Sequence, residues 1–197
     1  MRAAAAVALL LMMPARAAGA SSGGGSRERA PGSADPRYVR YSPPSRTFSC
    51  EIPSGWTPME EPTPRGSAVH IVGPQQARGA WRAAYHIHFF EKDKPGFVPS
   101  REALKAARRR DAGRDVTGMS SRRVARRPAR VFQVHEKRLL PAGRLPAELV
   151  ALHHFYVFVP SGSDDYFVIK LSTTEEAFLD YRRELGRFLE SFRVIGY

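Results

Sequence analysis

The chain has 197 residues, of which 43% are hydrophobic and 25% are charged, and its formal net charge is +12. A chain of this size and composition suits one soluble domain with its own core and argues against a second domain. Cys50 is the only cysteine, which excludes a disulfide within the chain. We interpret Cys50 as a small buried hydrophobic residue, because it lies in a run where apolar and polar residues alternate.

The first twenty residues have the features of a secretory signal peptide. Met1 and Arg2 form a short positive region, residues 3–13 form an apolar run too short to span a bilayer, and residues 18–20 are a cleavage site of small residues. Residues 15–17 offer a second cut, and the alternatives are an uncleaved anchor or a misassigned start. We therefore expect an exported protein, periplasmic or secreted, with no transmembrane span in the mature chain.

The rest of the chain divides into a linker and one domain. Residues 21–36 read SSGGGSRERAPGSADP and lack apolar periodicity, which predicts a disordered linker. A single domain is expected over residues 37–197. In chain order, its predicted strands are residues 38–41, 48–52, 69–72, 83–91, 120–124, 129–140, 148–159 and 166–172. Three prolines predict irregular backbone over residues 57–65.

Two helices are predicted in this domain. Ser100 can cap a helix over residues 101–112, which Gly113 would end. Thr173 and Glu176 form a capping box that predicts the start of the second helix. The apolar residues of this helix recur at spacings of three and four: Phe178, Tyr181, Leu185, Phe188 and Phe192. An apolar stripe of this kind predicts a helix that lies on a sheet.

The order of these elements indicates an α+β fold with a central, mainly antiparallel sheet and helices packed on its faces. Residues 160–165 are rich in turn-forming residues and join the last two strands as a hairpin. Neither helix lies in the strand–helix–strand alternation that parallel order would require.

Two segments resemble the PsbP-like family. They are FSCEIPSGW at residues 48–56, with Pro53 and Trp56, and the terminal pattern of a hairpin, a long helix and the triplet ESF at residues 190–192. The resemblance covers about residues 48–194. It implies an α/β/α sandwich around an antiparallel sheet, as in the extrinsic oxygen-evolving protein of photosystems and in many exported bacterial proteins without a known role. It implies no catalytic residues, because the family has no known shared catalytic constellation.

The histidines are the one group in the sequence that could bind a metal. The chain contains no glycine-rich phosphate loop and no G-x-S-x-G, H-E-x-x-H or C-x-x-C motif. His86 and His88 share one face of a predicted strand, and His135, His153 and His154 lie on two other strands, so three imidazoles could meet across the sheet. The candidate metal ligands are His86, His88, His135 and His154. The alternative is that these rings are half-buried structural residues, and we predict no cofactor.

The positive charge is concentrated between residues 101 and 130. The arginines that could form one basic surface are Arg108, Arg109, Arg110, Arg122, Arg123, Arg126 and Arg127. Such a surface attracts anionic lipid or cell-wall polymer. Nucleic acid is not an expected partner, because no aromatic residues interleave with the arginines to stack on bases. The alternative is a solvated surface that reflects the arginine usage of a GC-rich genome.

These observations predict an exported, non-enzymatic domain that binds or scaffolds an anionic component of the cell envelope or another protein. The alternative is a metal-dependent or otherwise cryptic enzyme built on the sheet face that carries the histidines.

Overall fold

A computed structural model describes residues 37–141, 146–162 and 164–195, apart from the side chain of Arg78. The predicted signal peptide and linker, residues 1–36, lie outside these ranges. The strands are β1 (Tyr38–Tyr41), β2 (Phe48–Pro53), β3 (Thr57–Thr63), β4 (Gly66–Gln76), β5 (Trp81–Phe90), β6 (Arg114–Val116), β7 (Ser120–Val124), β8 (Arg127–Leu140), β9 (Glu148–Pro160), β10 (Tyr166–Thr174) and β11 (Arg193–Val194). The helices are the 3-10 turn η1 (Ala77–Gly79), α1 (Ser100–Ala107) and α2 (Phe178–Ser191).

One eight-stranded sheet organises these elements. Its strands follow the order β3-β4-β5-β10-β9-β8-β6, and β7 also pairs with β8. All of its described pairings are antiparallel, which confirms the antiparallel sheet that the hairpins predict. A smaller sheet contains β1, β2 and β11. Strand β10 lies in the centre of this sheet, between β5 and β9. Its side chains point alternately to the two faces, so one row lies in the middle of each face.

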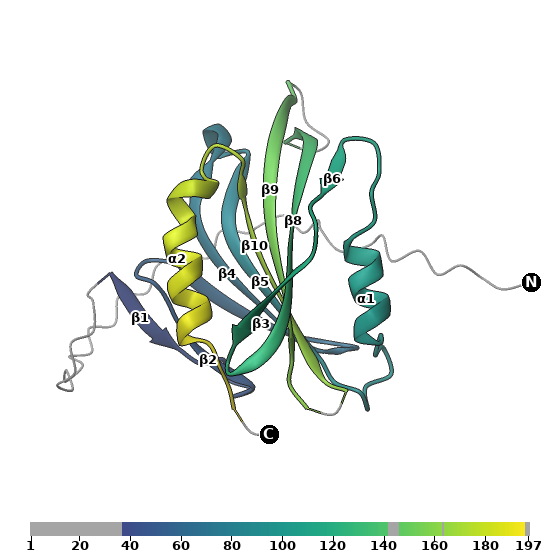
Figure 1. Cartoon of the computed structure of the whole chain (residues 1–197). Helices are drawn as coiled ribbons and strands as arrows, with labels where there is room; N and C mark the ends of the chain where they lie inside the picture. The colour runs from purple at the N-terminus through teal and green to yellow at the C-terminus, as the bar shows by residue number, and fades with distance from the viewer. Residues whose placement is uncertain (1–36, 142–145, 163, 196–197) are drawn as a thin grey trace, which may run out of the picture. The chain divides into compact units, whose positions relative to one another are not determined.

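Helix α2 covers one face of the sheet (Figure 1). Phe167 and Ile169 of β10 belong to the core cluster beneath it, together with Leu185 and Phe188 of α2. The ring of Phe188 stacks on Tyr85 at 4.4 Å between centroids. Cys50 belongs to the same cluster and is 2% exposed, so its prediction as a buried hydrophobic residue is confirmed. Burial raises the pKa of the Cys50 thiol, which keeps it unreactive.

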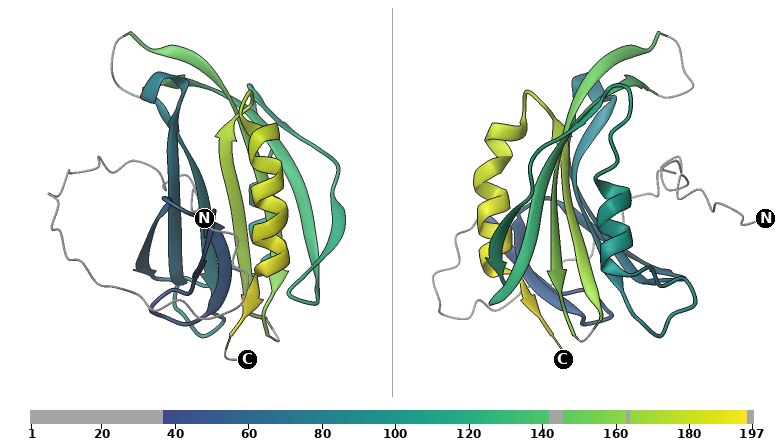
Figure 2. Two further views of the ribbon diagram at one scale, coloured as in Figure 1. Left: turned by 90° about the vertical axis from the view of Figure 1, so that its left-hand side faces the viewer. Right: turned by 45° about the vertical axis from the view of Figure 1, so that its right-hand side comes forward.

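Helix α1 lies on the opposite side of the sheet, as Figure 2 shows in its right-hand view. Its Leu104 joins a second cluster that includes Phe90, Phe132, Tyr166 and Val168. Tyr166 and Val168 are the first residues of β10 on this side, so the apolar cluster occupies the half of the face where β10 begins. The other half of this face carries polar and charged side chains.

The start of α2 differs from the sequence-based prediction. Thr173 and Thr174 continue β10, because their backbones pair with His153 and Leu152 of β9. The helix therefore begins only at Phe178, and Ala177 caps it without a side-chain hydrogen bond. The predicted capping box is wrong, since the sheet uses the backbone of these threonines before a helix can start.

Helix α1 is also shorter than predicted. It begins at Ser100 itself, after Pro99 as the N-cap, and ends at Ala107. Gly113 does not end the helix: it has a φ of +77° in a turn where the backbone N–H of Arg114 donates to the carbonyl oxygen of Asp111 at 3.0 Å. This turn leads into β6, which the sequence analysis did not predict.

Residues 57–63 form the regular strand β3, although their prolines predicted irregular backbone. β3 pairs with β4 and lies at one end of the sheet order. An edge strand tolerates proline, because only one side of its backbone must pair with a neighbouring strand. Pro58 and Pro62 therefore mark the edge of the sheet.

Candidate functional site

The sheet face on the α1 side changes from apolar to polar along its strands. Beyond Val168, β10 presents Lys170 and Ser172, which lie in register with His86 of β5 and His154 of β9. We call this region the polar face and define it by His70, His86, His88, Arg114, Glu136, His154, Lys170 and Ser172. In Figure 1, α1 lies beside the apolar half of this face, where β10 begins. Polar side chains thus occupy central strands where an apolar row would otherwise complete the core.

Three histidines meet on β4 and β5. His70 pairs across the strands with His86, and their Nδ1 atoms are 2.8 Å apart, so one ring donates a hydrogen bond to the other. The ring of His88 contacts that of His70 at 5.9 Å between centroids. Burial and then Lys170 hold the pKa of His86 well below its usual range, so that His86 is neutral and its Nδ1 can accept. Burial and then His70 lower the pKa of His88 to about 4.

A second group surrounds His154 on β9. This ring is 4% exposed; its Nδ1 lies 2.8 Å from Ser172 Oγ and its Nε2 lies 3.7 Å from Glu136 Oε2. A neutral ring with hydrogen on Nε2 satisfies both neighbours, accepting from the hydroxyl and directing its N–H at the carboxylate. Glu136 also pairs with Arg114 at 3.6 Å and with Arg138. One carboxylate therefore serves two guanidinium groups and an imidazole.

Lys170 lies between these two groups. Its cross-strand neighbours are His86 and Tyr156, and its side chain is partly buried. It makes no hydrogen bond or ion pair with any residue that the structure describes. Burial, followed by the positive charge of Arg138, lowers the pKa of Lys170 to about 8. The charge of Glu136 opposes this shift but does not cancel it. A partly buried ammonium group that makes no ion pair is costly, so Lys170 marks a site with too little negative charge.

The predicted metal ligands do not converge. His86 and His88 lie together on the polar face, and His154 lies beyond Lys170. His135 is on the opposite side of the sheet, where its ring contacts His153 at 4.3 Å and its Nδ1 lies 3.5 Å from Glu175. His153 in turn stacks on Phe178 of α2. Within the described ranges, no group of three or more His, Cys, Asp or Glu residues is arranged to hold a metal ion.

We expect purified protein to bind Zn²⁺ no more tightly than scattered surface imidazoles do. The closest pair, His70 and His86, already uses one nitrogen of each ring in a mutual hydrogen bond, and a structural zinc site needs four ligands. Calorimetry with the wild type and a His86→Ala, His88→Ala double variant measures this. Submicromolar binding that is lost in the double variant would instead support a metal-dependent enzyme.

The predicted basic residues fall into two groups along the chain, residues 108–110 after α1 and residues 122–127 on the β7–β8 hairpin. Arg108 follows α1 and lies over the ring of Phe132 at 5.8 Å, and Arg110 donates to the carbonyl oxygen of Val116. Arg122, on the β7 hairpin, reaches Glu190 at the end of α2 at 4.0 Å. These contacts connect the first group to the α1 side and the second to the α2 side. One basic surface formed by all seven arginines stays a prediction.

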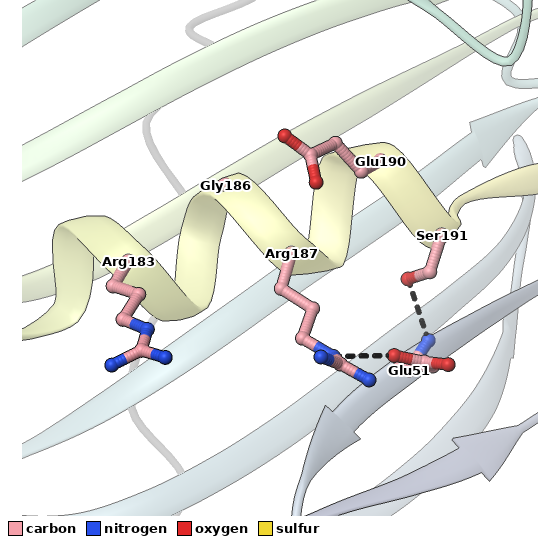
Figure 3. A pocket seen from close by; sticks show the side chains of 6 residues that line it. All are labelled: Glu51, Arg183, Gly186, Arg187, Glu190 and Ser191. Atoms are coloured by element: carbon pink, nitrogen blue, oxygen red, sulfur yellow. Dashed lines mark hydrogen bonds and ion pairs between the residues drawn. The ribbon is translucent and has the colours of Figure 1, made fainter. Parts of the chain in front are cut away.

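A surface pocket of about 450 Å³ lies between α2 and β2 (Figure 3). Arg187 Nε donates to Glu51 Oε2 at 2.6 Å, and the backbone N–H of Glu51 donates to Ser191 Oγ at 2.8 Å. The guanidinium of Arg187 also lies over the ring of Tyr38 at 4.4 Å. These groups hold α2 against the small sheet and satisfy one another's hydrogen-bonding groups. We therefore interpret the pocket as part of a structural contact.

The sequence analysis missed His70, Lys170, Glu136 and Arg114 as members of a site. Lys170 carried a usable signal, since it is the one charged residue in the otherwise apolar and hydroxyl-bearing strand β10. His70 lies inside the strand predicted at residues 69–72, where it alternates with the buried Val69 and Ile71, so this pattern also offered a signal. Arg114 lies on β6, which was not predicted. No local pattern reveals that these strands place their polar residues around Lys170.

Comparisons with known proteins give likeness of fold alone. No family model and no curated protein matches the chain. Among solved structures, a cyanobacterial PsbP from Synechocystis is 13% identical, with a TM-score of 0.46 over 85% of this chain and 98% of that one. LpqN, involved in cell envelope biogenesis of Mycobacterium tuberculosis, is 11% identical, with a TM-score of 0.48 over 80% and 90%. A protein of unknown function from Pseudomonas aeruginosa is 15% identical, with a TM-score of 0.43 over 76% and 92%. The chain is thus similar to a PsbP structure, as its sequence patterns indicated.

Proposed function

We propose that the chain is an exported, non-enzymatic binding or scaffolding domain of the cell envelope with a PsbP-like α/β/α sandwich, and that it binds its partner through the polar face. The observation that supports this most is Lys170, a partly buried ammonium group on the central strand of the sheet that makes no hydrogen bond or ion pair with any described residue. Stability alone would favour an apolar residue there. No described helix is long and apolar enough to cross a bilayer. The predicted signal peptide supports the envelope as the location.

Processing tests the export part of the proposal. We expect the mature protein to begin at Ser21 or Ala18, since each of those cuts leaves alanine at both positions that a signal peptidase requires to be small. Mass spectrometry of the intact protein from the periplasmic or secreted fraction measures the new terminus. Recovery of a chain that still carries Met1 would contradict export by a cleaved signal.

Retention in the envelope tests the binding part. We expect the tagged, full-length chain to fractionate with envelope material and a Lys170→Met variant to be released. Lys105→Met is the matched control, because Lys105 is exposed on α1. Equal retention of all three proteins would show that the polar face does not carry the function.

A further inference from the structure

The charges of the polar face are not balanced. Among the described residues, Glu136 is the one carboxylate that meets the central groups, and it is shared by Arg114, Arg138 and His154. Glu61 lies at the far edge, 3.4 Å from His70 Nε2. Arg114 and Glu136 have side chains that are only 17% and 13% exposed, so water screens them incompletely. The centre of the face therefore holds excess positive charge in a partly dry setting.

The site also offers hydrogen-bond donors that could orient a ligand. The indole Nε1 of Trp81 is buried and has no hydrogen-bond partner among the described residues, and its ring lies 6.4 Å from that of His154. Lys170 adds an unpaired ammonium group with three donors. Unsatisfied donors in a partly buried region are uncommon in folded proteins, and binding of an ion or ligand is one accepted reason for them.

We propose that the polar face binds an oxyanion, the phosphate or carboxylate group of an envelope ligand, with Lys170 as the contacting cation. This inference rests on the proposed function and adds the chemistry of the ligand to it. The oxyanion supplies the negative charge that Glu136 alone does not provide. Lys170 makes the direct charge-assisted hydrogen bonds, while Arg114 and Arg138 raise the local potential.

Binding of an oxyanion at this site is expected to be coupled to the uptake of protons by the protein. The titratable and charged groups that face the site are Glu61 of β3, His70 of β4, His86 and His88 of β5, Lys170 of β10, His154 and Tyr156 of β9, Glu136 and Arg138 of β8, Arg114 of β6, and Arg65 between β3 and β4. A bound anion favours the charged form of Lys170 and of its neighbouring imidazoles, so the complex takes up protons. Affinity is therefore expected to fall as pH rises from 7 to 9.5. For citrate, whose carboxyl groups are already ionised at pH 7, attraction to surface arginines alone would not change over that range, because arginine also stays charged.

Calorimetric titration of the purified domain with inorganic phosphate and, separately, with citrate tests the proposal. At constant ionic strength and pH 7, we expect at least one probe to bind, with affinity reduced at least tenfold in Lys170→Met and unchanged in Lys105→Met. The probe that binds identifies phosphate or carboxylate as the recognised group. Binding of neither probe, or equal binding by wild type and Lys170→Met, would overturn the proposal.

Two controls separate the possible failures. Urea unfolding of each variant confirms that it is folded, and Arg138→Gln, at an exposed position, provides a second test with an expected loss of at least threefold. If neither probe binds but Lys170→Met is still released from the envelope, the ligand class is wrong while the proposed function stands. If a probe binds through Lys170 and envelope retention does not depend on it, the oxyanion site stands and the envelope function is wrong.

Discussion

Phe188→Ala is expected to lower the free energy of unfolding by about 3 to 5 kcal/mol, the cost of removing a large aromatic side chain from a packed core. Phe188 is fully buried, stacks on Tyr85 at 4.4 Å and contacts Phe192 at 5.9 Å between ring centroids. It therefore joins α2 to the sheet at the middle of the larger core. Urea denaturation at pH 7 measures the loss.

Leu179→Ala is the matched control, because it also removes apolar atoms from α2 but at a side chain that is 71% exposed. Its cost is expected to stay within about 0.5 kcal/mol, as at other surface positions. A larger loss from Leu179→Ala than from Phe188→Ala would mean that the apolar face of α2 has been assigned to the wrong side.

Acidification is expected to destabilise the protein through its buried histidines. Burial is the first cause that lowers the pKa of His86, His88, His153 and His154 below the ordinary 6.5, and neighbouring cations add to it. Between the lowered folded-state values and 6.5, the unfolded chain binds more protons than the folded one, so stability rises with pH. The stability held above pH 6.5 is lost as pH falls toward 4. For His88 alone, with a folded-state pKa of about 4, the loss is up to about 3 kcal/mol.

Urea unfolding of wild type and His88→Gln at pH 7, 6, 5 and 4.5 measures this effect. The glutamine keeps a polar side chain of similar length but cannot titrate, so the variant is expected to lose less stability per pH unit than the wild type. Carboxylates contribute equally to both proteins, and the difference between the two slopes isolates the histidine. Parallel slopes would show that His88 titrates alike in the folded and unfolded chains.

Local sequence patterns predicted those strands and helices whose conformation depends mainly on the residues within them. The alternation of Phe167, Ile169 and Leu171 and the spacing of Leu185, Phe188 and Phe192 were enough to predict a strand, a helix and the faces that they bury. The errors occurred where the conformation of a segment depends on pairing with a strand that is distant in the sequence. Thr173 and Thr174 stay extended because β9 pairs with them.

The same limit applies to the candidate site. The period of two assigned His86 and His88 correctly to one face, opposite Tyr85 and Ile87, which are in the core under α2. It could not show that β10 lies beside β5, and so it could not place Lys170 next to His86. His135 was grouped with them, yet its position on β8 sends its ring to the α2 side, near Glu175. Membership of a site depends on strand order and register, which a single sequence does not encode locally.

The titration of Lys170 itself tests the proposed oxyanion site most directly. In protein labelled with ¹³C at lysine, the signal of Lys170 can be assigned by its loss in Lys170→Met and followed by NMR from pH 6 to pH 11. We expect the pKa of Lys170 to be about 8 in the free protein and to rise toward the ordinary value of about 10.4 when the oxyanion that binds is present at saturation. If Lys170 titrates at its ordinary value in the free protein and its pKa does not respond to phosphate or citrate, the proposed oxyanion site is wrong.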